Sequence, residues 1–174
     1  MVLIGSSLGG AISLYTAAAL PERVRGMVGL NPAGAPLLGA DREAVVHAFR
    51  GGSGRAAMEL MRKLYSRPPR GPWLFARGLA RHFAAPPVQQ LLSDLREDVP
   101  GLDPELLAGL GVPVLILWGE DDRLLPAGSV EWFREQLPAA RVEVLQRSGH
   151  LPMVESRERV AARIVRFLLE LDAS

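Results

Sequence analysis

The chain has 174 residues, contains no cysteine and has only 6% aromatic residues. The absence of cysteine excludes a disulfide framework, a thiolate nucleophile and thiolate metal ligands, and it fits a reducing compartment. No apolar run approaches the roughly 20 residues that span a bilayer, and no basic segment followed by an apolar one opens the chain. We therefore expect a cytoplasmic protein without stable insertion into a membrane.

Neither sign of charge dominates, since 20 basic and 19 acidic residues give a formal net charge of +1. This balance and the few aromatic residues argue against a nucleic-acid partner. The basic residues gather between Arg42 and Arg81, a segment with nine basic and only two acidic residues. The pattern favours a solvated helical surface, and an electropositive lid that attracts anionic substrates or a lipid surface is the alternative. No pattern predicts the oligomeric state.

Apolar runs that are typical of buried strands occur near both ends of the chain, and helical patterns follow them. The runs lie at residues 2–4, 24–30, 112–118 and 141–145. The helical patterns lie at residues 8–20, 129–137 and 154–171. This alternation predicts an α/β fold with a mostly parallel sheet of about four strands and with helices on both faces. Functional residues are then expected at the carboxyl ends of the strands.

The middle of the chain, residues 35–108, has no strand-like run. Its helical stretches are expected at about residues 44–49, 55–65 and 88–95, with breaks rich in proline and glycine between them. We interpret residues 35–108 as a helical cap inserted over the sheet. The core then consists of two parts, residues 1–34 and residues 109–174.

A G-x-S-x-G turn directly follows the first apolar run. In Gly5-Ser6-Ser7-Leu8-Gly9 the strand is expected to turn sharply into a helix. Gly5 and Gly9 fit such a turn because a Cβ atom at either position would clash where strand and helix crowd together. Such a turn presents the Ser7 hydroxyl as a nucleophile, and an ordinary turn serine is the alternative. The Leu8 backbone N–H, at the start of the helix, would stabilise the oxyanion of an acyl transfer.

Candidate partners for Ser7 follow two later strands. A serine hydroxyl is a weak nucleophile at neutral pH, so it needs an imidazole to take its proton and a carboxylate to orient that imidazole. His150 follows the last strand, and Asp121 and Asp122 both follow the strand that ends at Trp118. The residues alone leave both aspartates open as the acid.

With these motifs the chain resembles the α/β-hydrolases, in particular the lid-bearing serine esterases and carbon–carbon hydrolases, over essentially its whole length. In that family the acid lies three residues after the glycine of a W-G-x-x-D-x-x-x-P segment, which selects Asp122. The histidine lies in a G-H-x-P-x-x-E segment, matched here by His150 and Glu155. The resemblance implies hydrolysis of an ester, thioester, amide or activated carbon–carbon bond of a small molecule through an acyl-enzyme, with no cofactor and no metal.

The resemblance also implies further strands before the nucleophile strand and a second oxyanion donor in a loop among them. We therefore expect that donor upstream of Met1, an open sheet edge at residues 2–4, and poor solubility or weak activity of the isolated chain. Two other hypotheses stay open. The chain could be a ligand-binding or scaffold member of the same fold without catalysis, or an incomplete gene fragment.

The substrate pocket is expected beneath the cap. We assign to it the side chains of Leu8, Trp73 and Phe75, although packing within the cap is the alternative for the two aromatic residues. Glu155 is expected at the start of the last helix, where a negative charge suits the helix dipole. The sequence does not define the acyl length or the leaving group of the substrate.

Overall fold

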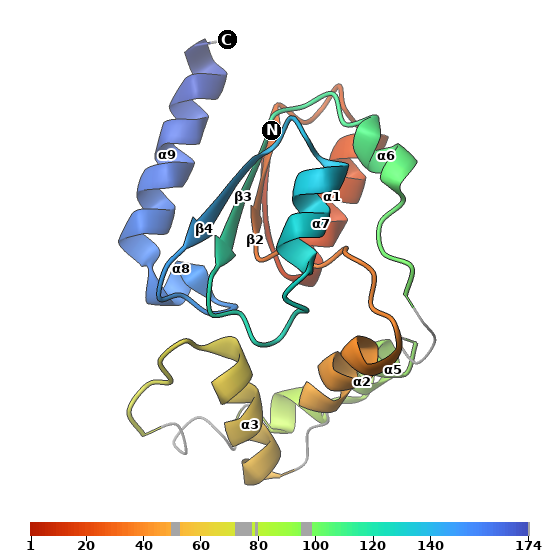
Figure 1. Cartoon of the computed structure of the whole chain (residues 1–174), viewed down its shortest axis with the longest axis vertical. Coiled ribbons are helices and arrows are strands. Elements are labelled where there is room, and N and C mark those ends of the chain that lie inside the picture. Colours follow the sequence, from red (N-terminus) through yellow and green to blue (C-terminus); the bar gives the residue numbers. More distant parts are fainter. Residues whose placement is uncertain (50–52, 72–77, 79, 95–98, 174) are drawn as a thin grey trace.

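The computed structural model describes residues 1–49, 53–71, 78, 80–94 and 99–173 of the chain. Within these residues, four strands form one parallel sheet in the order β1-β2-β3-β4, in which each strand pairs with the next one along the chain (Figure 1). The strands are β1 (Val2–Ser6), β2 (Gly26–Leu30), β3 (Val114–Gly119) and β4 (Arg141–Leu145). The predicted α/β fold with about four parallel strands is confirmed.

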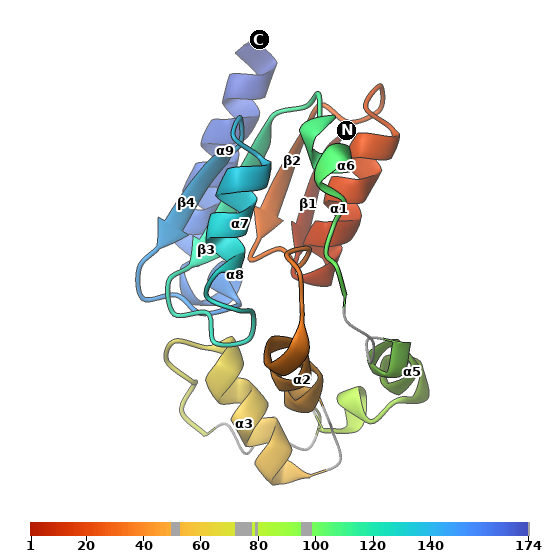
Figure 2. The ribbon, with the colours of Figure 1, turned by 45° about the vertical axis from the view of Figure 1, so that its right-hand side comes forward.

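Helices cover both faces of this sheet. The helices α1 (Leu8–Ala19), α6 (Pro104–Ala108) and α7 (Ser129–Gln136) lie on one face, and α9 (Arg157–Ala173) lies on the other (Figure 2). The short helix α8 (Pro152–Glu155) precedes α9, so the single helix expected at residues 154–171 is two helices separated at Ser156.

The core consists of two apolar clusters, one on each side of the sheet, because successive residues of a strand point to opposite faces. Every residue of β2 and β3 is buried, as expected for strands covered on both faces. The cluster beneath α1, α6 and α7 contains Leu14, Met27, Leu107, Val114, Ile116, Trp118, Leu125, Phe133 and Leu137. The cluster beneath α9 contains Val28, Leu30, Leu115, Leu117, Leu145, Val160, Phe167 and Leu171.

The two outer strands of the described sheet differ in character. At β4, the Arg141 guanidinium binds the Glu170 carboxylate of α9 at 2.6 Å, and this hydrogen bond lowers the pKa of Glu170 and raises the pKa of Arg141. Near β1, exposed apolar side chains occur on the strand and on the helix that follows it: Ile4 of β1 is 51% exposed, and Ile12 and Tyr15 of α1 are each 58% exposed. One outer strand is therefore joined to α9 by an ion pair, and exposed apolar side chains lie on and beside the other.

The cap helices α2 (Gly39–Ala48), α3 (Gly54–Leu64) and α5 (Pro86–Asp94) lie beyond the carboxyl ends of the strands (Figure 1). All three expected stretches are helical, although α2 begins five residues earlier than expected. Leu60 and Leu64 of α3 pack against Leu124 of the loop after β3, so the cap and the core share a buried cluster. The division at residue 108 remains a prediction, and α6 packs through Leu107 into the cluster of the core.

Candidate active site

The turn between β1 and α1 holds Ser7 in an unusual backbone conformation. Ser7 has a φ of 52° and a ψ of −124°, a region that residues other than glycine rarely occupy. Its N–H donates to the Leu30 carbonyl oxygen at 3.1 Å, and its carbonyl oxygen accepts from the N–H groups of Gly10 at 2.8 Å and Ala33 at 2.9 Å. The turn is therefore attached to the loop after β2. The Leu8 amide opens α1 and has no acceptor within the helix, as for any first helical residue.

Of the two glycines that the sequence predicts to relieve crowding in this turn, only Gly5 does so. A Cβ atom on Gly5 would collide with the Gly9 carbonyl group, which agrees with the expected crowding. The same expectation for Gly9 is wrong, because a Cβ atom there would meet nothing within 4 Å. The second crowded position is Gly10, where a Cβ atom would lie 2.6 Å from Pro32 Cβ. Close packing of α1 on the loop after β2 thus depends on Gly10.

Asp122 and His150 form a buried pair at the carboxyl ends of β3 and β4. The His150 Nδ1 atom lies 2.8 Å from Asp122 Oδ2, and each side chain is only 2% exposed. An ionised carboxylate only accepts hydrogen bonds, so a neutral imidazole in this pair carries its hydrogen on Nδ1 and its lone pair on Nε2. This tautomer is the one that a general base requires.

The Asp122 carboxylate is held by four donors, which match its four lone-pair positions. Its Oδ1 atom accepts from the N–H groups of Leu124 at 2.8 Å and Leu125 at 3.1 Å. Its Oδ2 atom accepts from Asn31 Nδ2 at 2.6 Å as well as from the imidazole. The carboxylate therefore has a fixed orientation toward His150.

Asn31 is the residue of this site that the sequence analysis does not identify. It is fully buried, has a φ of 42°, and stands directly after β2. Its Nδ2 donates to Asp122, and its Oδ1 accepts from the Gly119 N–H at 3.0 Å, so one side chain joins the ends of β2 and β3. The available signal is an asparagine directly after a strand, because asparagine tolerates the left-handed conformation.

Asp121 and Asp122, the two candidates for the acid in the sequence, have different hydrogen-bond partners. Asp122 binds the imidazole, whereas Asp121 Oδ2 accepts from the Ser66 hydroxyl at 2.5 Å. Ser66 follows α3 and lies within residues 35–108, the predicted cap. Geometry and resemblance thus select the same aspartate as the partner of His150.

Ser7 lies at the same end of the sheet as the Asp122–His150 pair, at the carboxyl end of β1. The hydrogen bonds of the described residues include none between the Ser7 hydroxyl and the imidazole, and catalytic hydrogen bonds often tighten only when substrate binds. Two connections link Ser7 to the pair. Its N–H binds Leu30, the neighbour of Asn31, and its side chain shares a cavity with Leu124 and Leu125.

This cavity has a volume of about 360 Å³ and lies between the core and the cap. Ser7 and Leu8, at the turn between β1 and α1, line this cavity, and Leu8 is one of the residues predicted for the substrate pocket. Trp73 and Phe75, the other predicted pocket residues, lie outside the described residues. The described lining is otherwise apolar: Ala11, Ala33, Gly34, Ala35, Leu37, Val45, Phe49, Phe83, Val88, Leu91, Leu92, Val99, Gly101, Leu102, Leu124 and Leu125.

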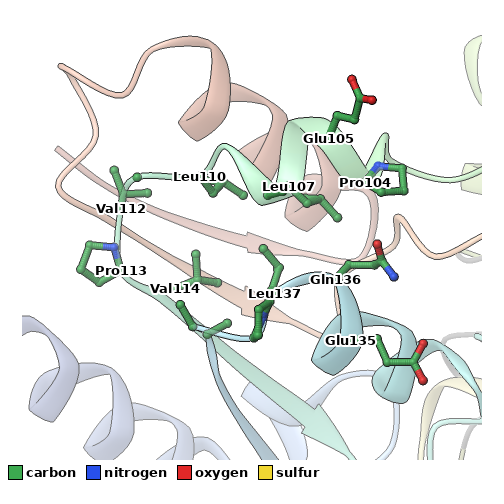
Figure 3. Close-up of a pocket in the computed structure, with 15 residues that line it drawn as sticks. Pro104, Glu105, Leu107, Leu110, Val112, Pro113, Val114, Glu135, Gln136 and Leu137 are labelled. Atoms are coloured by element: carbon green, nitrogen blue, oxygen red, sulfur yellow. The ribbon is translucent and has the colours of Figure 1, made fainter.

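A second cavity, of about 840 Å³, lies at the opposite end of the sheet (Figure 3). Leu107, Val114 and Leu137 converge in it from α6, β3 and the end of α7, while the carboxylates of Glu105 and Glu135 point away. Its lining residues include neither a serine nor a histidine. The smaller cavity, which Ser7 lines, is therefore the candidate substrate site.

Two absences concern the described ranges of the chain. In these ranges no three histidine, aspartate or glutamate side chains are grouped so that they could hold a metal ion. No helix there combines the length and the apolar character that crossing a bilayer requires.

Comparison with known proteins agrees with the described fold. The model of the alpha/beta hydrolase family matches residues 2–163, which is most of the chain. The chain belongs to the alpha/beta hydrolase family. The match includes Ser7, Asp122 and His150.

Individual relatives are distant in sequence. Lipase 1 of Psychrobacter immobilis is 27% identical over 186 residues, which cover 97% of this chain and 56% of the lipase. A 2-hydroxymuconate semialdehyde hydrolase of Pseudomonas putida is 27% identical, with 98% of this chain and 63% of the hydrolase covered. The chain thus spans between half and two thirds of the length of these relatives.

A solved structure, that of lip1 from Acinetobacter baumannii, superposes with a TM-score of 0.82 at 22% identity. The superposition covers 99% of this chain and 62% of that protein. At this identity the likeness establishes the fold.

Proposed function

We propose that this alpha/beta hydrolase cleaves a carboxylic ester or a related acyl bond of a small molecule through an acyl-enzyme. Ser7 is the nucleophile, His150 the general base and acid, and Asp122 the carboxylate that orients the imidazole. The observation that carries the proposal is the buried Asp122–His150 pair, in which Nδ1 and Oδ2 are 2.8 Å apart. The pair lies at the carboxyl end of the sheet, where Ser7 stands in a strained turn.

The first half of the reaction forms the acyl-enzyme. His150 Nε2 accepts the hydroxyl proton of Ser7 while Ser7 Oγ bonds to the substrate carbonyl carbon, and the carbonyl oxygen becomes an oxyanion. The Leu8 N–H stabilises this oxyanion. When the tetrahedral intermediate collapses, the bond to the leaving group breaks, and His150 gives its proton to the leaving group.

The second half releases the acid. His150 Nε2 takes a proton from a water molecule, and the resulting oxygen bonds to the acyl carbon. Collapse of this second intermediate breaks the bond to Ser7 Oγ, which regains a proton from His150. Asp122 stays ionised throughout and stabilises the imidazolium by the hydrogen bond at Nδ1.

The lining of the smaller cavity favours an uncharged, apolar acyl group. Among its described lining residues, Ser7 is the only one with a hydroxyl and none carries a charge. A second candidate bond is an activated carbon–carbon bond. It is supported by the 27% identity with a 2-hydroxymuconate semialdehyde hydrolase, in an alignment that covers 98% of this chain. Both reactions use the same three residues.

The test is a hydrolysis assay with p-nitrophenyl esters of increasing acyl length, run on the wild type and three variants. Ser7→Ala and His150→Ala should each lower kcat by about 1000-fold or more, because the three residues act as a unit. Ser6→Ala is the matched control, since Ser6 is the neighbouring serine of the same turn, and it should keep most of the activity. A Ser7→Ala protein with near-wild-type turnover would refute the proposal.

A further inference from the structure

The Glu155 carboxylate joins the cap to the loop that carries His150. Its Oε2 atom accepts from the Gly149 N–H at 2.7 Å and from the Ser66 N–H at 3.1 Å. Its Oε1 atom accepts from the Arg67 N–H at 3.0 Å. Residues 65–67, which follow α3, are called the cap foot below. A single carboxylate thus holds the cap foot and the residue next to the imidazole together.

A second hydrogen bond ties the cap foot to the acid loop. The Ser66 hydroxyl donates to Asp121 Oδ2 at 2.5 Å, and Asp121 is the neighbour of Asp122. The Asp121 N–H in turn donates to the Ser148 carbonyl oxygen at 2.9 Å, which connects the loops after β3 and β4. The cap foot is therefore attached next to both members of the buried pair.

The cap foot also packs directly on the backbone before His150. A Cβ atom on Gly149 would lie 2.7 Å from the Leu64 carbonyl oxygen and 2.7 Å from the Ser66 nitrogen. These are backbone atoms, which cannot move aside as a flexible side chain would. Only glycine at position 149 allows this approach, so a displacement of the cap foot must change contacts at the histidine loop.

We propose that Glu155 is a positioning residue that couples the cap foot to His150, so that the placement of the cap sets the placement of the catalytic imidazole. This proposal rests on the proposed function of Ser7, Asp122 and His150. The helix-dipole role expected for Glu155 does not explain why its carboxylate accepts from three backbone N–H groups. When the cap foot is seated, the three N–H bonds fix the histidine loop. When the cap foot is displaced, Gly149 loses a packing neighbour, and Glu155 Oε2, which accepts from Gly149, no longer accepts from Ser66 as well.

The coupling predicts a specific kinetic signature. The described lining of the substrate cavity includes neither the cap foot nor Glu155. Loss of the coupling should therefore leave KM nearly unchanged and lower kcat. Glu155→Gln keeps the size of the side chain but replaces one acceptor oxygen by an NH₂ donor, which cannot accept from a backbone N–H.

The first experiment compares Glu155→Gln, Ser66→Ala and Glu158→Gln at a temperature where each is folded by circular dichroism. We expect about a tenfold lower kcat with unchanged KM for Glu155→Gln, and a smaller loss in the same direction for Ser66→Ala. Glu158→Gln is the matched control, since Glu158 is an exposed glutamate three residues away, and it should keep the wild-type kcat. A Glu155→Gln protein with wild-type kcat, or with a change in KM alone, would overturn the proposal.

The second experiment does not depend on turnover. Amide hydrogen exchange is followed by mass spectrometry in peptides that cover the cap foot and in peptides that cover residues 148–151. Glu155→Gln should raise exchange in both segments together, whereas Glu158→Gln should raise it in neither. Faster exchange in only one segment would contradict the coupling. Turnover that survives Ser7→Ala would refute the proposed function instead, and the exchange experiment would still decide the coupling.

Discussion

Replacement of Asn31 should destabilise the fold by an amount that the structure allows to be worked out. Asn31→Ala removes the hydrogen bond to the ionised Asp122, worth about 1.5–3 kcal/mol. It also leaves the buried Gly119 N–H without its acceptor, at a cost of about 1–3 kcal/mol. Alanine at a φ of 42° adds about 1 kcal/mol. The free energy of unfolding should fall by about 3.5–7 kcal/mol, a large part of the roughly 5–15 kcal/mol of a typical domain.

Two further substitutions separate these contributions. Asn31→Gly loses the same two hydrogen bonds but adopts the left-handed conformation without strain, so it should be about 1 kcal/mol more stable than Asn31→Ala. Asn31→Asp keeps the size and the acceptor for Gly119, yet it places a second carboxylate oxygen where Nδ2 now lies, 2.6 Å from Asp122 Oδ2. Repulsion between like charges should make this isosteric change destabilising too.

The assay is urea unfolding followed by circular dichroism, with the kcat of each variant measured in the absence of urea. The activity of the folded variants should also fall, because Asp122 loses one of the groups that orient it toward His150. The reasoning would be refuted if Asn31→Ala stayed within about 0.5 kcal/mol of the wild type, the range of ordinary surface substitutions, or if it were more stable than Asn31→Gly.

Three further predictions concern the nucleophile turn and the outer strand. Gly10→Ala should cost about 1–3 kcal/mol by overpacking against a proline, while Gly9→Ala, which meets nothing, should not destabilise the fold; urea unfolding of this matched pair checks the contrast. Ser7→Gly should be about 1 kcal/mol more stable than Ser7→Ala because it relieves the strain of a φ of 52°, and equal stabilities in the same assay would argue against stored strain. The Arg141 hydrogen bond lowers the pKa of Glu170 from its ordinary 4.5, so its contribution is present at neutral pH and disappears as the pH falls through the lowered value. Glu170→Gln should therefore lower Tm slightly at neutral pH and not well below pH 4.5, and a Tm difference that persists in acid would contradict this sign.

The two central strands of the described sheet were predictable because they are buried on both faces. The runs at residues 24–30 and 112–118 are almost continuously apolar, and they contain all of β2 and most of β3. The cap helices were predictable in existence but less so in their ends. For example, α2 begins at Gly39, where neither a side-chain cap nor an apolar period marks the start.

The candidate site was predictable only where a local motif carries it. Ser7, Asp122 and His150 stand in short segments with a recognisable pattern, and each directly follows a strand or its turn. Asn31 binds a residue 91 positions away. The histidine motif includes Glu155 and the nearby Gly149, but the bond from Glu155 to Ser66 spans 89 positions, and no periodicity of the sequence reveals such distant pairs. Gly9 shows the opposite failure, since the motif names it although the described chain leaves space for a side chain there.

The most direct test of the central claim is mass spectrometry of the folded chain after incubation with a fluorophosphonate, which reacts with an activated serine. The account predicts a single adduct on Ser7, no adduct on the Ser7→Ala protein, and a much slower reaction of the His150→Ala protein. A folded wild-type protein without an adduct, or with an adduct on another serine, would contradict the claim that His150 and Asp122 activate Ser7.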